Sequence, residues 1–247
     1  MPLAVIPINV AQLRSHCSSC SLHELCLPAG LNKHELDQLD AIINRKRPLR
    51  RNDYLYRAGA GLQSLFAVRT GFFKSSVLHD DGREQIAGFH MAGELLGMDA
   101  IGSGKHVCDS IALEDSEVCE IPFHDLEYLG RELPALQQHF HRIMSREITR
   151  DYGVMLLLGS MRAEERLAAF LLNLSQRFAA RGYSATQFNL RMTREEIGSY
   201  LGLKLETVSR AFSHFQNEGL VVVQNKSIEI KDLDRLRSVV GHCSAAH

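Results

Sequence analysis

The stretch "MTREEIGSYLGLKLETVSRAFSHFQNEGLVVV", residues 192–223, carries the strongest local signal in the chain. Thr193 and Glu196 form a T-x-x-E capping box, which is typical of the first turn of a helix. Apolar residues then recur on one face, and Gly202 allows a tight turn into a second helix. Residues 220–230, "LVVVQNKSIEI", predict two strands joined at "QNK". This order of elements predicts a winged helix-turn-helix.

The second helix of this motif presents three side chains that can read DNA. Glu206, Ser209 and Arg210 lie at i, i+3 and i+4, so they project from one face near the N-terminal half. Arginine can donate two hydrogen bonds to guanine, glutamate can accept one from cytosine, and serine can bond to either kind of base edge. The alternative is a solvated Glu–Arg pair on an ordinary helix, but the capping box, turn and wing in register favour DNA binding. The residues expected to hold phosphates are Lys204 and Thr207, with Arg191 or Arg194.

Upstream of this motif, the pattern changes to short β-rich runs. "SLFAVRTGFFKSSVL", "EQIAGFH" and "EVCEIP" are separated by turns rich in Gly and Asp, which predicts an antiparallel sheet packed as a roll. We therefore predict an α+β fold: an N-terminal β-roll, a long helix, and the winged helix-turn-helix. The expected division is a cysteine segment at 1–30, the β-roll at 31–133, a dimerisation helix at 134–160 and the DNA-binding domain at 161–247.

The long helix has a repeating stripe with alternating spacings of three and four. A stripe of this kind is typical of a helix that pairs with a partner helix, although a single amphipathic helix packed on the roll has a similar stripe. The length of the helix and the strict alternation favour a homodimer seam. Its expected members are His141, Met144, Ile148, Asp151, Met155 and Leu158.

Charge and hydropathy limit the classes of partner. Residues 1–159 carry 16 Lys and Arg against 20 Asp and Glu, whereas residues 160–247 carry 12 against 9. An anionic partner such as DNA is therefore expected at the C-terminal half. No stretch has the length of apolar residues that a membrane span needs, so we expect a cytoplasmic protein. No Ser-His-Asp set, phosphate loop or acid–base carboxylate pair stands out, so we do not expect an enzyme.

Three cysteines lie close together near the N-terminus. "HCSSCSLHELCLP", residues 16–28, places Cys17, Cys20 and Cys26 in a C-x2-C-x5-C pattern. Cytosolic thiols are kept reduced, so this pattern indicates metal binding or oxidant sensing more than disulfides. On the residues alone, a structural zinc site is the favoured interpretation.

The chain resembles the CRP/FNR superfamily of bacterial transcription regulators over nearly its whole length. This resemblance implies that the β-roll is similar to the cyclic-nucleotide-binding jelly roll. Within the superfamily, "HCSSCSLHELC", "EDSEVCEIPF", "AEERLAAFLLNLSQRFAARG" and "LETVSR" resemble the oxygen-responsive FNR branch. The resemblance implies an oxygen-labile [4Fe-4S] cluster held by Cys17, Cys20, Cys26 and Cys119. Zinc in the same four-cysteine set remains the alternative.

The resemblance also implies the biological role. It is that of a global regulator of anaerobic metabolism, in which the cluster promotes dimerisation and DNA binding and oxygen reverses both. The implied partners are a palindromic DNA site of the TTGAT, four-base gap, ATCAA type and RNA polymerase, contacted at the turn of Asp80, Asp81 and Gly82. A CRP-like or zinc-stabilised DNA-binding regulator without an iron-sulfur cluster is the alternative.

Cyclic nucleotide binding is not expected, although part of its signature is present. Gly93, Glu94 and Leu95 match the Gly-Glu-Leu of the cyclic-nucleotide cassette. The Arg-Ser pair that would hold the phosphate is absent, and Asp109 and Ser110 stand in that region. An anionic Asp disfavours a phosphate. Outside the cluster set, Cys108 is expected to be buried and Cys243 exposed, while His16 and His23 flank the cysteines.

Overall fold

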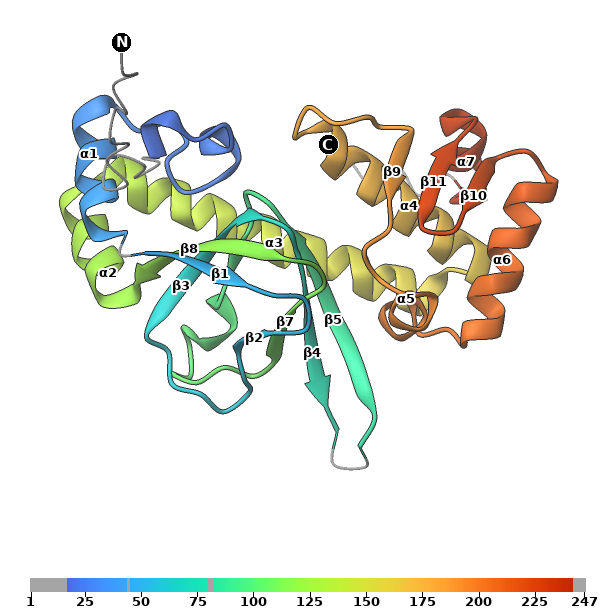
Figure 1. Cartoon of the computed structure of the whole chain (residues 1–247), viewed down its shortest axis with the longest axis horizontal. Coiled ribbons are helices and arrows are strands. Elements are labelled where there is room, and N and C mark those ends of the chain that lie inside the picture. Colours follow the sequence, from blue (N-terminus) through green and yellow to red (C-terminus); the bar gives the residue numbers. More distant parts are fainter. Residues whose placement is uncertain (1–16, 44, 80–81, 242–247) are drawn as a thin grey trace, which may run out of the picture.

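The computed structural model describes residues 17–43, 45–79 and 82–241 (Figure 1). Two short 3-10 helices, Cys17–Ser19 and His23–Leu25, lie in the described part of the cysteine segment. Helix α1, Lys33–Ile42, follows and begins with a capping box between Asn32 and Glu35. Among the described residues, no helix combines the length and apolarity that crossing a membrane requires.

Two four-stranded antiparallel sheets form the predicted β-roll. Their strand orders are β1-β8-β3-β6 and β2-β7-β4-β5. The strands are β1 Arg45–Leu49, β2 Tyr54–Tyr56, β3 Ser64–Thr70, β4 Phe72–Leu78, β5 Glu84–Met91, β6 Leu95–Leu96, β7 Asp109–Ala112 and β8 Ser116–Pro122, with a 3-10 helix at Met98–Ala100.

The roll depends on a glycine between strands β3 and β4. Gly71 has a φ of 91°, and an added Cβ would lie 2.0 Å from the hydroxyl oxygen of Ser116 on β8. Only glycine can combine that backbone conformation with so close an approach. The sequence predicted these two strands as one β-rich run, and Gly71 is the point at which the chain passes from one sheet to the other.

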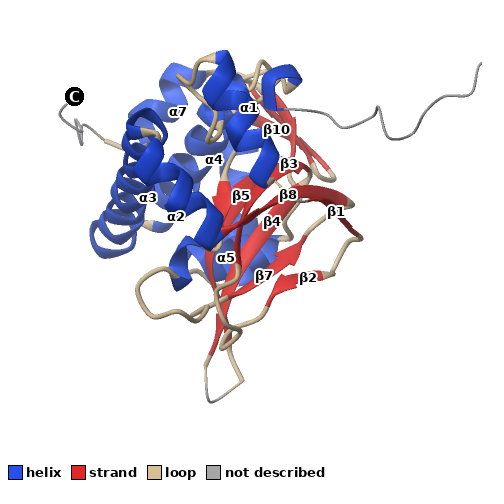
Figure 2. Ribbon diagram, turned by 90° about the vertical axis from the view of Figure 1, so that its left-hand side faces the viewer, coloured by secondary structure: helices blue, strands red, loops and turns tan. Residues whose placement is uncertain are grey.

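Helices connect the roll to the C-terminal domain. Helix α2, Phe123–Glu132, is followed at once by α3, Pro134–Ser160, and then by α4, Ala163–Ala179. Figure 2 shows α2 and α3 beside one another on the same side of the roll. The long helix was predicted from the sequence, whereas α2 was not.

The C-terminal domain is the predicted winged helix-turn-helix. Helix α5, Arg194–Leu201, and helix α6, Leu205–Asn217, flank a turn in which Gly202 has a φ of 63°. The wing is β10, Val221–Gln224, paired with β11, Ser227–Ile230. The sequence did not predict the third strand of this sheet, β9 at Gln187–Asn189, or the last helix, α7 at Leu233–Val239.

One apolar core joins the roll to the DNA-binding domain. Phe72, Ile86 and Phe89 of the roll are buried in the same cluster as Phe170 of α4 and Ile197 of α5. Because α5 packs on β5, the position of the helix-turn-helix relative to the roll is fixed by packing as well as by the covalent link through α3 and α4 (Figure 1).

Candidate DNA interface and cysteine site

Helix α6 is anchored by one face and exposes the opposite one. Val208, Phe212 and Phe215 are 0%, 1% and 1% exposed and pack in the domain core. Of the five predicted DNA-binding residues, Lys204, Glu206 and Arg210 are exposed, and Thr207 and Ser209 are partly exposed. The helix-turn-helix therefore leaves the predicted reading face open, at the edge of the molecule furthest from the roll (Figure 1).

The two further phosphate candidates make contacts within the protein. Arg191 forms an ion pair of 2.7 Å with Glu114, in the segment between β7 and β8. The guanidinium of Arg194 lies 4.5 Å from the centre of the Phe212 ring. Lys204 and Thr207 thus remain the better phosphate candidates. Among the described residues no ion pair is found for Lys204, and the neutral side chain of Thr207 is partly exposed.

The four predicted ligand cysteines line one cavity of about 40 Å³. Cys17, Cys20 and Cys26 come from the N-terminal segment, and Cys119 comes from the middle of β8, next to Ala67 of β3 in the sheet. All four cysteines are in the thiol form and of intermediate exposure. The roll thus brings a residue 93 positions beyond Cys26 to the same cavity, which the sequence alone does not reveal.

The electrostatics of the thiols reflect burial and one another's proximity. Burial, followed by the carboxylate of Asp40 and the thiols of Cys26 and Cys119, raises the pKa of Cys17. Burial raises the pKa of Cys26 to about 12. Within the described part of the chain, no three His, Cys, Asp or Glu side chains are already arranged to hold a metal ion. The donor set suits a thiophilic group, because a bound cation favours the thiolate that burial disfavours.

Polar contacts hold the cysteine segment against the rest of the protein. The backbone N–H of Cys17 donates to Asp40 of α1 at 2.7 Å. His23, one of the two flanking histidines, has one ring nitrogen 3.1 Å from the carbonyl oxygen of Cys20 and the other 2.7 Å from Glu24. His139 of α3 contacts the carbonyl of Cys26. His16 lies outside the described residues.

The predicted seam of α3 is an exposed apolar face. Ile148 and Met155 are 52% and 63% exposed, and Leu158 is 37% exposed. Asp151 and His141 are also exposed, whereas Met144 is partly buried. The opposite side of the helix packs inward through Leu136, Ile143 and Leu157. An apolar stripe of this size on a single helix is a surface that a partner helix can cover.

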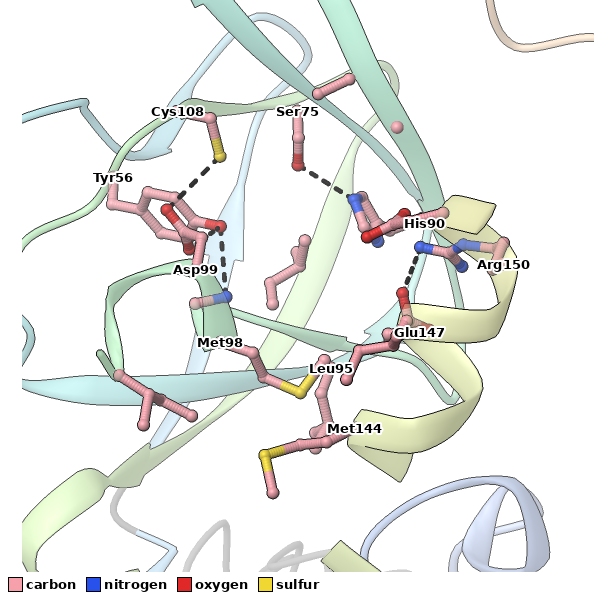
Figure 3. A pocket seen from close by; sticks show the side chains of 17 residues that line it. Tyr56, Ser75, His90, Leu95, Met98, Asp99, Cys108, Met144, Glu147 and Arg150 are labelled. Atoms are coloured by element: carbon pink, nitrogen blue, oxygen red, sulfur yellow. Dashed lines mark hydrogen bonds and ion pairs between the residues drawn. The ribbon is translucent and has the colours of Figure 1, made fainter. Parts of the chain in front are cut away.

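A cavity of about 360 Å³ lies between the roll and α3 (Figure 3). Asp99, Glu147 and Asp151 give its lining acidic character. Arg150 also lines it, but the guanidinium is paired with Glu147 and lies 3.6 Å from Glu94. Acidic groups and an arginine that is already paired form a poor site for a cyclic phosphate.

Glu94, the cassette glutamate, is engaged by arginines from two helices. Its carboxylate is 2.6 Å from both Arg177 and Arg181 of α4, as well as near Arg150 of α3. Burial would raise its pKa, but the three guanidinium charges lower it to about 2. The sequence predicts Glu94 only as part of a nucleotide signature and does not predict its pairing with arginines. Arg177 and Arg181 lie more than 80 residues away from it, so no local pattern signals the cluster.

Two further sequence predictions concern cysteines outside the set. Cys108 is 7% exposed, and its thiol lies 3.5 Å from Asp99, as expected for a buried thiol. Cys243 lies outside the described residues.

Comparisons with known proteins match both halves of the chain. Residues 46–132 match the family model for a cyclic nucleotide-binding domain, and residues 165–239 match that for a Crp-like helix-turn-helix domain. The fumarate and nitrate reduction regulatory proteins of Escherichia coli K12 and Salmonella typhimurium LT2 are each 52% identical over 92% of this chain and 91% of their own. The structure of FixK2 from Bradyrhizobium japonicum is similar with a TM-score of 0.73 and 30% identity, covering 79% of this chain and 96% of that one.

Proposed function

The chain belongs to the CRP/FNR family of transcription regulators, and from this premise we propose that it is an oxygen-sensing global regulator of anaerobic metabolism. The biological role is inferred from the relatives of the chain, whose names refer to fumarate and nitrate reduction. The means of sensing oxygen is inferred from the cysteine site. A regulator that acts on DNA in this way works in the cytoplasm.

The proposed DNA-bound form is a homodimer. Two copies of α3 pair through Met144, Ile148, Asp151, Met155 and Leu158, which places two α6 helices on the two halves of a palindromic site. Glu206, Ser209 and Arg210 read bases, and Lys204 and Thr207 hold phosphates. The exposure of both faces in the single chain supports this assignment.

The observation that carries the sensing proposal is the shared cavity of Cys17, Cys20, Cys26 and Cys119. These four residues would hold a [4Fe-4S] cluster, and when bound it would supply an oxygen-labile link between the N-terminal segment and β8. One unit would then include the thiols, the roll and helix α1, whose Asp40 accepts the backbone N–H of Cys17. Without that link in air, the dimer would be weaker and the DNA would be released.

RNA polymerase is the proposed second macromolecular partner. The described ends of β4 and β5, which flank the turn, project from the molecule, as Figure 1 shows. Of its expected contact residues, Gly82 is described and exposed, whereas Asp80 and Asp81 lie outside the described residues. Gly82 can therefore be reached from solvent without disturbing the roll.

Anaerobic reconstitution with iron and sulfide tests the proposal. Visible absorbance, iron and sulfide content, and binding to a palindromic DNA site should appear together and be lost together in air. A colourless protein that holds one zinc ion and binds DNA equally well with and without air would overturn the sensing proposal. That result would favour a zinc-stabilised regulator.

A further inference from the structure

A buried hydrogen bond joins the cysteine segment to helix α3. Nε2 of His139 lies 3.0 Å from the carbonyl oxygen of Cys26, and the histidine is 7% exposed. The same oxygen accepts the backbone N–H of Ala29 at 3.2 Å. A carbonyl oxygen has two lone pairs, so the turn and the helix together use both. The peptide that follows Cys26 is thus held at once by its own turn and by α3.

Apolar packing surrounds this contact on both sides. Leu27, which follows Cys26, and Leu136, one turn before His139, are each 1% exposed and belong to one buried cluster. Cys26 itself and Phe140 pack against that cluster. A displaced Cys26 carbonyl would leave its second lone pair without a donor in an apolar surrounding, which is costly.

The position of His139 on α3 connects the contact to the seam. Leu136, His139 and Ile143 are the buried positions of the first turns, and Met144 stands about 100° around the helix from Ile143. Asp151 lies twelve residues beyond His139, about 18 Å along the axis at 1.5 Å per residue. A helix of this length moves as a rod over such a distance, so a shift at His139 displaces the seam residues as well.

We propose that His139 is a positioning residue that couples the cysteine segment to dimerisation. It fixes α3 against the Cys26–Ala29 turn, so that the order imposed on this turn when the four cysteines are loaded is transmitted to the seam. This inference rests on the proposed function, because it assumes that loading the cysteines strengthens the dimer.

The test compares the dimer dissociation constant of the full chain with and without the cluster. Sedimentation equilibrium under anaerobic conditions gives the ratio of the two constants for wild type, His139→Leu and His139→Gln. The glutamine amide can still donate to the Cys26 carbonyl. His124→Leu, at an exposed histidine on α2, is the control for adding a leucine. Iron and sulfide content show that each variant is loaded to the same extent.

We expect the His139→Leu protein to bind the cluster normally. Its ratio of dimer dissociation constants, without the cluster over with it, should be about tenfold smaller than in wild type, a change equivalent to about 1.4 kcal/mol. His139→Gln and His124→Leu should keep the wild-type ratio within about threefold. A second readout needs no cluster: amide exchange of Leu27, Ala29 and Gly30 in the cluster-free protein should speed up in His139→Leu and not in His124→Leu.

The coupling role would be overturned by a His139→Leu variant that keeps the wild-type ratio. It would also be overturned by a variant that folds, by circular dichroism, but cannot assemble the cluster, since His139 would then serve assembly alone. A wild-type protein with a ratio of one, or without a cluster, would instead refute the proposed function. The two failures are therefore distinguishable.

Discussion

The ammonium group of Lys74 on strand β4 lies 3.1 Å from the carboxylate of Glu196 in the first turn of helix α5. The same ammonium is 3.0 Å from Glu84 on β5. Next to it, the backbone N–H of Ile86 donates to the hydroxyl of Ser199 at 2.9 Å. These contacts hold the helix-turn-helix on the outer face of the roll.

Lys74→Met should therefore loosen the DNA-binding domain. Burial lowers the pKa of Lys74, but the two carboxylates outweigh burial and raise it, which indicates that the charged form is stabilised in the folded protein. Removal of the lysine leaves both carboxylates without this counter-charge and should cost about 1–3 kcal/mol of unfolding free energy. Urea unfolding measures the loss. Lys231→Met, at an exposed pair with Glu229, should cost far less; equal costs would contradict a special role for Lys74.

Glu94→Gln should show a pH-dependent loss of stability. The pKa of Glu94 is lowered from its ordinary 4.5 to about 2, so its contribution is complete above pH 4.5 and is lost as pH falls towards 2. At neutral pH the substitution should cost about 3 kcal/mol, given about 1.4 kcal/mol for each pKa unit. Unfolding curves from pH 7 to pH 3 should show the gap to wild type narrowing. Glu127→Gln, at an exposed position on α2, should show a small gap at all pH values.

Serine substitutions should distinguish the cysteines that are ligands from those that are not. Replacing any one of Cys17, Cys20, Cys26 and Cys119 with serine should abolish the chromophore and the oxygen response, because a four-thiolate site loses a ligand. Cys108→Ser should be nearly silent, since that thiol lies away from the shared cavity. Cys243→Ser is also expected to be nearly silent. Iron analysis after anaerobic reconstitution decides the matter, and a fully loaded Cys119→Ser protein would refute the ligand set.

Two substitutions on and beside α6 should differ in what they remove. Arg210→Ala should cost about 1–3 kcal/mol of binding free energy and relax the preference at one guanine in each half-site. Lys204→Ala should weaken binding to all sequences alike and reduce the salt dependence. A panel of altered half-sites, titrated at several salt concentrations, distinguishes these outcomes. Identical behaviour of the two variants would mean that the assigned roles are wrong.

Asp151→Ala should strengthen the dimer without the cluster. In a parallel pair of α3 helices, Asp151 faces its copy, and like carboxylates in a partly buried seam repel each other. Sedimentation of the cluster-free protein in air should show the variant as a dimer at concentrations where wild type is a monomer. Ser145→Ala, at an exposed position on the same helix outside the seam, should change nothing. A monomeric Asp151→Ala protein would mean that the seam register is wrong.

Local signals in the sequence determined the fold class and the reading face. The capping box of Thr193 and Glu196 is present, Gly202 adopts the left-handed backbone that its turn requires, and the wing forms at the predicted residues. The capping box, the turn and the wing depend on contacts between residues that are close in sequence, so a short stretch of sequence is enough to predict them. Helix α2 escaped prediction because it is only 10 residues long and Pro134 divides it from α3, the long helix that was predicted.

Only the tertiary structure decided which distant groups meet. Cys119 reaches the cavity of the N-terminal cysteines because β8 lies beside β3, and His139 reaches Cys26 across 113 residues of sequence. Glu94 was predicted as a remnant of a nucleotide site, but α4 packs two arginines against its carboxylate. Such pairs follow from how sheets and helices pack, which depends on the apolar surface of the whole chain. Charge and hydrogen-bonding capacity can be read residue by residue, but the partner of each group depends on which buried surfaces come together.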